Sequence, residues 1–215
     1  MAVSRPRILI ADDHTLVAEM CQKLLEDRFN VVGIAKDGRS LVRMAEEAKP
    51  DVIVVDIAMP LLNGLDAGEQ VKRSRPAVKL IFLTMTGDPE VADESFRRGG
   101  SAYLVKTCAT SELVLAVWEV LRGKTYLSKG LPRHEVNYLR RRGVEITEEV
   151  SLLTPLQRQV LQLLAEGKVM KQVSDVLGMK PRTVAFHKYR IMERIGAQTN
   201  ADLVRYAVAR RIVAA

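Results

Sequence analysis

The sequence predicts an α/β domain with a doubly wound, five-stranded parallel sheet, followed by a smaller all-α domain. Its 215 residues are many for one compact domain and sufficient for two. Short apolar runs alternate with stretches of helical period in the first part of the chain, and only helical period returns after residue 151. We therefore expect the first domain over residues 1–123, a linker over 124–150 and the second domain over 151–215.

The apolar runs of the first domain are expected to be parallel strands, because four to six continuous apolar residues suit a sheet that is covered on both faces. They lie at residues 8–11, 31–35, 52–55, 80–83 and 102–105. Helical period is found at residues 14–27, 38–47, 65–74, 89–98 and 111–122. Strands that alternate with helices in this way form a sheet with helices on both faces.

The apolar pattern lapses over residues 124–150. This segment contains Gly130, Pro132, Gly143 and a run of three arginines at 140–142. Glycine and proline interrupt regular structure, so we expect a linker with one short helix near residues 136–139.

Helix signals return at Thr154, which begins a capping box with Pro155 at the first helical position and Gln157 at the third. This helix is expected to end near residue 165. Further helices are expected over 169–177, over 181–195 and from a cap at Thr199 to about residue 210. Two helices joined by a turn that contains glycine are typical of a helix-turn-helix domain.

Composition excludes several classes of protein. No uncharged apolar run of 18 residues is present, so no membrane span is expected. The first seven residues lead into an apolar run without the core of a signal peptide, so we expect a cytoplasmic protein. Cys21 and Cys108 are too few for a disulfide scaffold and, with three scattered histidines, give no zinc-site spacing.

Charge is distributed unevenly along the chain. Residues 1–123 contain 16 Lys/Arg and 18 Asp/Glu, whereas residues 151–215 contain 11 and 4. The second domain alone is therefore expected to meet a polyanion, with nucleic acid the first candidate and a solvated basic surface the alternative.

Polar side chains stand where four of the predicted strands end. Asp12 and Asp13 follow the first strand, Asp56 the third, Thr84 the fourth and Lys106 the fifth. The carboxyl ends of parallel strands meet at one edge of a sheet. Three carboxylates there would repel one another without a cation, and Mg²⁺ prefers such oxygen ligands. Thr84 and Lys106 suit a phosphoryl group beside the metal, and Asp56 has the chemistry of a nucleophile that forms an aspartyl phosphate.

Five motifs of the first domain resemble those of one family. They are Ile8 to His14, Val54 to Pro60, Asn63-Gly64, Leu83 to Thr86 and Tyr103 to Lys106. With them, residues 7–122 resemble the flavodoxin-like receiver domain of bacterial two-component response regulators. The resemblance implies that Asp56 accepts a phosphoryl group from a sensor histidine kinase. It also implies that Mg²⁺ is held by Asp12, Asp13, Asp56 and the carbonyl of Ala58. Thr84 and Lys106 would bind the phosphoryl oxygens, and Thr84 and Tyr103 would form a switch.

The helix expected over residues 181–195 has a basic outer face. Val184, His187, Ile191 and Ile195 recur at steps of three and four residues and are expected to face inward, with His187 a core histidine. The residues expected to contact double-stranded DNA are Arg182, Thr183, Ala185, Phe186, Lys188, Tyr189 and Arg190.

The second domain also contains family motifs. They include Leu153 to Pro155, Gly167-Lys168, Thr183-Val184, His187, Ile195-Gly196 and Leu203. These residues resemble the LuxR-type helix-turn-helix of NarL/FixJ regulators. The resemblance implies that helix 181–195 enters the major groove and that the last helix pairs two copies through Val204 and Val208. Ala185 stands where lysine is common, Lys180 where serine is usual and Gln157 where glutamate is usual, so the manner of base readout stays open.

Together these features predict a transcription regulator, not an enzyme, in which phosphorylation of Asp56 controls homodimerisation and DNA binding. Two alternatives remain at this point. One is a Mg²⁺-dependent phosphohydrolase with Asp56 as nucleophile, although Ala58 occupies the place expected for its acid/base carboxylate. The other is a phosphate-independent interaction module with the same fold.

Overall fold

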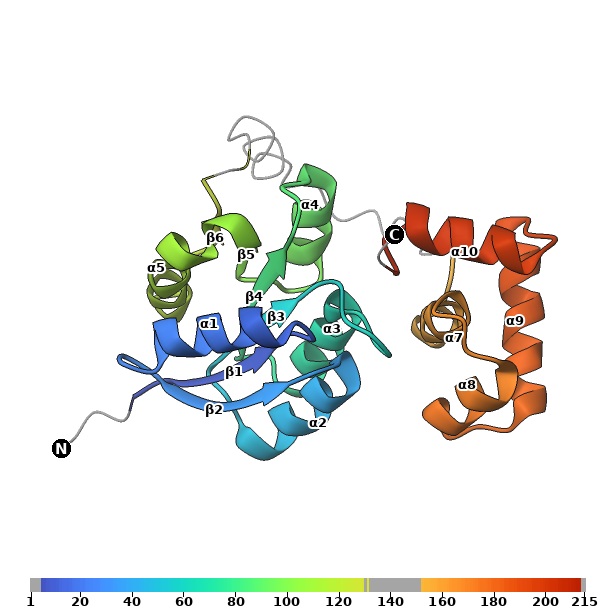
Figure 1. Ribbon diagram of the computed structural model, residues 1–215, viewed down its shortest axis with the longest axis horizontal. Helices are drawn as coiled ribbons and strands as arrows, with labels where there is room; N and C mark the ends of the chain where they lie inside the picture. The colour runs from blue at the N-terminus through green and yellow to red at the C-terminus, as the bar shows by residue number, and fades with distance from the viewer. Residues whose placement is uncertain (1–4, 130, 132–151, 214–215) are drawn as a thin grey trace. The chain divides into compact units, whose positions relative to one another are not determined.

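The computed structural model describes residues 5–129, 131 and 152–213. They form two compact units, an α/β unit that contains the sheet and an all-helical unit near the C-terminus (Figure 1). None of the helices in these residues combines the length and the hydropathy needed to cross a membrane.

The sheet of the first unit is parallel throughout, with the strand order β2-β1-β3-β4-β5-β6. The strands are β1 (Arg7–Ala11), β2 (Asn30–Ala35), β3 (Val52–Asp56), β4 (Lys79–Thr84), β5 (Ala102–Val105) and β6 (Tyr126–Leu127). The order reverses between β1 and β3, and ligand sites of doubly wound sheets lie at the carboxyl ends of the strands beside such a reversal.

The helices of this unit alternate with the strands, as the sequence predicts. They are α1 (Thr15–Leu25), α2 (Gly38–Ala48), α3 (Gly64–Ser74), α4 (Pro89–Arg97) and α5 (Ala109–Leu121), with a 3₁₀ turn, η1 (Lys106–Cys108), before α5. Side-chain oxygens of Asp37, Asn63 and Asp88 accept the first backbone N–H groups of α2, α3 and α4. These caps explain where the three helices begin.

Successive strand residues face opposite sides of the sheet, so the core has two layers. Ile8, Ile10, Val52 and Val54 pack with buried residues of α1 and α5. On the other side, a Cβ built at Gly68 of α3 would lie 3.0 Å from the ring of Phe82. β1, β3, β4 and β5 are buried between the two helix layers, as their continuous apolar runs predict, whereas β2 at the edge of the sheet is half-buried.

The structure has one strand more than the five that the sequence predicts. Tyr126 and Leu127 pair with Ala102 and Tyr103 as a sixth, edge strand. Two residues contain too little periodicity to identify a strand, so only pairing with β5 shows it. This strand lies within the residues expected to form the linker, while the predicted short helix at 136–139 lies outside the described residues.

The helical unit consists of α7 (Pro155–Ala165), α8 (Met170–Leu177), α9 (Pro181–Ile195) and α10 (Asn200–Ala209), which agree closely with the predicted ranges. The capping box of α7 is present, since Gln157 N–H donates to Thr154 Oγ1 and Thr154 N–H donates to Gln157 Oε1. Gly178 and Gly196 end α8 and α9 with positive φ, which glycine adopts without strain. The α8 and α9 helices with the turn between them form the expected helix-turn-helix.

Candidate functional site

Four side chains meet where β1 and β3 end. Oxygen atoms of Asp12, Asp13 and Asp56 and a ring nitrogen of His14 all lie within 4.8 Å of one another. Asp12 and Asp56 are buried, because the strands that end on them lie in the middle of the sheet. The structure thus brings together the three carboxylates that the sequence places at two strand ends.

Lys106 joins this cluster from the end of β5. Its Nζ lies 2.9 Å from Asp12 Oδ2 and 2.8 Å from Asp56 Oδ2, and only 6% of its side chain is exposed. A buried ammonium group is stable only with such partners. Lys106 therefore neutralises one of the three negative charges and fixes the orientation of Asp56.

The environment shifts the pKa of both members of this ion pair. Burial raises the pKa of Asp56, and the bond from Lys106 offsets this only in part. Burial alone would lower the pKa of Lys106, but the bonds to Asp12 and Asp56 outweigh it and raise that pKa overall. Lys106 thus stays protonated beside its carboxylate partners at neutral pH.

The residues of the cluster fit a hard divalent cation. Three carboxylates face one buried ammonium group, which leaves an excess of negative charge. Asp13 Oδ1 is buried without a hydrogen-bond partner among the described residues, with His14 Nδ1 3.1 Å away. Carboxylate oxygens in this number suit Mg²⁺, which also keeps water ligands.

His14, which was named from the sequence only as the last residue of a motif, is a member of the cluster. Its Nδ1 lies 3.1 Å from Asp13, 3.4 Å from Asp12 and 4.0 Å from Asp56, while most of its side chain is exposed. The signal available in the sequence was its position directly after Asp12 and Asp13.

The loop after β3 closes tightly over the backbone of Asp56. A Cβ built at Gly64 would lie 2.0 Å from the carbonyl oxygen of Asp56, so no other residue fits there without a shift. Gly64 N–H donates to the Ile57 carbonyl, and Ala58 N–H donates to Asp56 Oδ1 at 3.3 Å. Ala58 is exposed, and its bond to Asp56 places its backbone next to the carboxylate cluster.

Thr84 and Tyr103 lie on neighbouring strands. Thr84 ends β4 and is largely buried, and its hydroxyl accepts a hydrogen bond from Thr86 N–H at 3.3 Å. Tyr103 is fully buried, and its hydroxyl donates to the Thr86 carbonyl at 3.1 Å. Both side chains therefore bond to the loop that joins β4 to α4.

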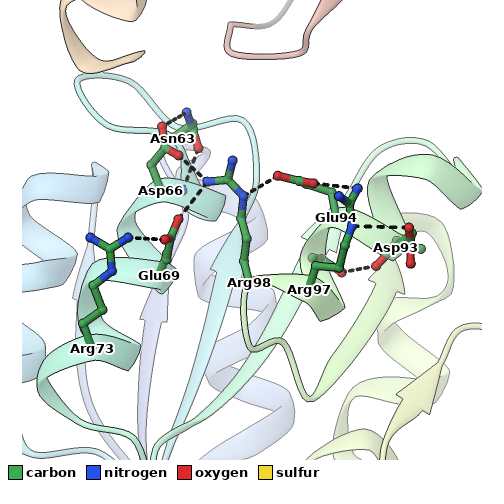
Figure 2. Close-up of polar contacts among 10 residues, drawn as sticks. Asn63, Asp66, Glu69, Arg73, Asp93, Glu94, Arg97 and Arg98 are labelled. Carbon is green, nitrogen blue, oxygen red and sulfur yellow. Dashed lines mark hydrogen bonds and ion pairs between the residues drawn. The ribbon is translucent and has the colours of Figure 1, made fainter. Parts of the chain in front are cut away.

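A partly buried ion-pair network between α3 and α4 was not predicted (Figure 2). Arg98, after α4, pairs with Asp66 and Glu69 of α3 and with Glu94 of α4. Asp66 also accepts from Asn63, the N-cap residue of α3. The network ties the start of α3 to the end of α4. Arg98 lies 32 positions from Asp66 and 29 from Glu69 in the chain, beyond the reach of local periodicity.

The α9 helix has the predicted inner and outer sides. Val184 and Ile191 are fully buried, and Ile195 and His187 are half-buried. His187 Nδ1 is buried without a hydrogen-bond partner among the described residues. The residues expected on the outer side are mostly exposed, namely Arg182, Thr183, Phe186, Tyr189 and Arg190, while Ala185 and Lys188 are half-buried.

The residues expected to pair two copies lie on α10. Val204 is 38% exposed and Val208 is half-buried, so this expected pairing surface is accessible in part.

Comparison with known proteins identifies both units. Residues 8–118 match the response regulator receiver domain, and residues 151–207 match the bacterial regulatory proteins of the luxR family. The chain is 31% identical over 209 residues to the transcriptional regulatory protein MctR of Rhizobium johnstonii, covering 96% of this chain and 95% of MctR. It is 31% identical over 214 residues to the oxygen regulatory protein NreC of Staphylococcus haemolyticus, covering 96% and 99%.

Solved structures agree with this assignment. A LuxR-family two-component response regulator from Aurantimonas sp. is 29% identical with a TM-score of 0.59, over 64% of this chain and 99% of that one. A structure of two RcsB dimers bound to two parallel DNAs is 25% identical with a TM-score of 0.56, over 94% and 98%. The related proteins are transcription regulators, which argues against the phosphohydrolase alternative. This chain belongs to the bacterial response regulators that join a receiver domain to a LuxR-family DNA-binding domain.

Proposed function

We propose that Asp56 is the phosphoacceptor through which a sensor histidine kinase controls DNA binding by this protein. The observation that supports it best is the cluster at the strand ends, where Lys106 bonds to both Asp12 and Asp56 beside Asp13. A phosphoacceptor needs a carboxylate held next to groups that neutralise incoming phosphoryl oxygens, and this cluster provides them.

The transfer would follow from this geometry. An oxygen of Asp56 forms a bond to phosphorus while the P–N bond to the histidine of the donor breaks and the imidazole leaves with the electron pair. Lys106 is close enough to move from Asp56 to a phosphoryl oxygen, and the Thr84 hydroxyl supplies a hydrogen bond to another. Asp12, Asp13, Asp56 and the Ala58 carbonyl would hold Mg²⁺, which supplies Lewis acidity to the phosphoryl group.

Phosphorylation would act on DNA binding through the switch residues. The Thr84 hydroxyl, which accepts from Thr86 N–H, would donate its proton to a phosphoryl oxygen and so couple the phosphate to the loop to which Tyr103 also bonds. Such a change biases a two-state element near β4 and β5. We expect it to favour a homodimer that contacts an inverted repeat in double-stranded DNA through α9, with Val204 and Val208 of α10 at the contact between copies. Because its target is chromosomal DNA, we expect the protein to act in the cytoplasm.

The test is labelling of the purified full-length chain by acetyl phosphate with Mg²⁺. We expect one phosphoryl group per chain in the wild type, none in Asp56→Asn and little in Asp13→Asn. Asp27→Asn, an exposed carboxylate after α1, is the matched control and should label like the wild type. Retained labelling of one equivalent in Asp56→Asn would refute the assignment.

DNA binding is measured separately, by retention of duplexes from a random-sequence library with and without the phosphodonor. The proposal expects stronger retention after phosphorylation in the wild type and no change in Asp56→Asn. Equal retention in both states would instead support the phosphate-independent alternative.

A further inference from the structure

Two aromatic side chains project from the outer side of α9. Phe186 is 57% exposed and Tyr189 is 68% exposed, and they lie three positions apart, on the same face of the helix. Transfer of an exposed aromatic ring from water to an apolar contact is favourable. Two exposed rings on one helix face therefore favour binding of a partner with an apolar surface. In Figure 1, α9 runs along one edge of the helical unit, and α7 and α8 pack against its other side.

The Phe186 ring has a defined orientation before any partner binds. The ring of His187 meets it edge-on, with centroids 5.6 Å apart. The Arg190 guanidinium group lies 5.7 Å from the centroid of Phe186. These neighbours restrict the ring, which reduces the entropy lost when it contacts a partner.

The polar groups on this face that could read bases are basic, namely Arg182, Lys188 and Arg190, and such groups bond guanine. The sequence of α9 contains no Asn or Gln, the side chains that bond adenine in a bidentate manner. Arg190 pairs with Glu193 at 3.2 Å in addition to its contact with Phe186. Bidentate reading of guanine by Arg190 would have to break this pair.

Charge around the aromatic pair matches the phosphates of DNA. Arg182, one turn before Phe186, and Lys188 are basic, and the first acidic residue of α9 is Glu193. Phosphate contacts by such residues position a helix in the major groove but do not select a sequence. Within that groove, the thymine C5-methyl group is the apolar feature of the base edges.

We propose that Phe186 and Tyr189 read thymine methyl groups, so that sequence selection by α9 depends on apolar contact. This inference rests on the proposed function, since it requires that α9 binds in the major groove. It names the chemical feature of DNA that the helix recognises, which is the methyl group of thymines within each half-site.

The test begins with selection of duplexes from a random-sequence library by the full-length protein in the presence of acetyl phosphate and Mg²⁺. The enriched duplex is then made with deoxyuridine in place of each thymidine of the half-site, which removes the methyl group and keeps the hydrogen-bonding groups of the base. We expect the dissociation constant to rise roughly fourfold for each methyl that the rings contact.

Three variants test which side chains cause the preference for thymine over uracil. The double variant Phe186→Ala/Tyr189→Ala should bind the thymine and uracil duplexes with nearly equal affinity, and the exposed positions of both side chains favour a folded protein, which circular dichroism verifies. Tyr189→Phe keeps the ring and should keep the preference for thymine. Arg182→Ala should weaken binding to both duplexes by the same factor, because a phosphate contact does not distinguish them.

The outcomes separate this inference from the proposed function. An enriched sequence that binds equally well with uracil in the wild type would overturn methyl readout and leave DNA binding by α9 intact. A thymine preference that persists undiminished in the double variant would also overturn it. Selection that enriches no sequence would contradict both.

Discussion

Lys106 Nζ lies 2.8 Å from an oxygen of Asp56, and the same ammonium group lies 2.9 Å from Asp12. One buried cation therefore joins carboxylates from two adjacent strands. Under the proposed function, phosphorylation of Asp56 would redirect this ammonium group to a phosphoryl oxygen. This arrangement has consequences for both stability and metal affinity.

Replacing Lys106 with Met should have opposite effects on these two properties. Without Mg²⁺, two buried carboxylates lose their partner, and the free energy of unfolding should fall by about 3 kcal/mol. Mg²⁺ should bind more tightly to the variant, because a positive charge next to the metal site is gone. Both effects can be measured by urea titration with and without Mg²⁺. The fluorescence of Trp118, the single tryptophan, reports on the receiver domain through its contact with Phe29.

The control for this variant is Lys36→Met, since Lys36 is exposed and its ammonium group donates to the Thr15 hydroxyl at 3.3 Å. It should change the free energy of unfolding by less than about 0.5 kcal/mol. Weaker binding of Mg²⁺ to Lys106→Met would contradict the proposed electrostatic role of Lys106.

Arg98→Met should destabilise the receiver domain strongly. The Arg98 and Asp66 side chains are only 12% and 8% exposed, so removal of the guanidinium leaves a buried carboxylate without its cation. We expect a loss of about 3 kcal/mol in the free energy of unfolding, measured by the same fluorescence titration. Arg73→Met is the matched control, because Arg73 pairs with Glu69 at the exposed surface of the same network (Figure 2) and should contribute less than about 0.5 kcal/mol. An equal loss of unfolding free energy in the two variants would show that the stabilisation by Arg98 does not depend on its burial.

The two cysteines should differ in reactivity. Cys21 is fully buried, and burial raises the pKa of its thiol to about 12, which suppresses the reactive thiolate. Cys108 is half-buried in η1. Titration with a chromogenic disulfide reagent should therefore modify one thiol rapidly in the native protein and the second only in denaturant. Cys108→Ser should abolish the rapid phase, and a rapid phase that persists in this variant would contradict the burial of Cys21.

Acid should loosen α10 through Asp202. Its carboxylate accepts bonds from Thr199 and Gln198 N–H groups and from Arg205, and these bonds lower the pKa of Asp202 below its ordinary value. Because the pKa of Asp202 is lower in the folded protein than in the unfolded chain, its ionised form stabilises the fold fully above the unfolded pKa of about 3.9. This stabilisation is lost progressively as the pH falls from that value toward the lower folded-state pKa. Hydrogen exchange of residues 200–209 should therefore show less protection at pH 3 than at pH 7.

Asp202→Asn should show reduced protection of α10 already at pH 7 and a smaller change between pH 7 and pH 3. Asp175→Asn, which alters an exposed carboxylate of α8, should behave like the wild type. Parallel loss of protection in the wild type and in Asp202→Asn would rule out the cap as the source of acid sensitivity.

Local patterns in the sequence determined most of the architecture. Continuous apolar runs marked the five long strands, because a strand covered on both faces needs no polar residues. Proline at the start and glycine at the end marked α9, since both act on backbone angles within one turn. Asp56 and Lys106 could be placed at one edge of the sheet because parallel strands share the direction of the chain. The expected roles of these residues, of Thr84 and of Tyr103 stay predictions.

Tertiary structure decided the contacts between side chains that lie far apart in the sequence. The pairing of β6 with β5, the approach of His14 to the carboxylates and the burial of Arg98 against Asp66 have no local signature. The sequence alone showed that Lys106 and Asp12 end two strands, but not that one ammonium group reaches both Asp12 and Asp56. Periodicity reports the direction in which a side chain leaves the backbone. The distance between two such groups depends on how strands and helices pack, which is a property of the whole fold.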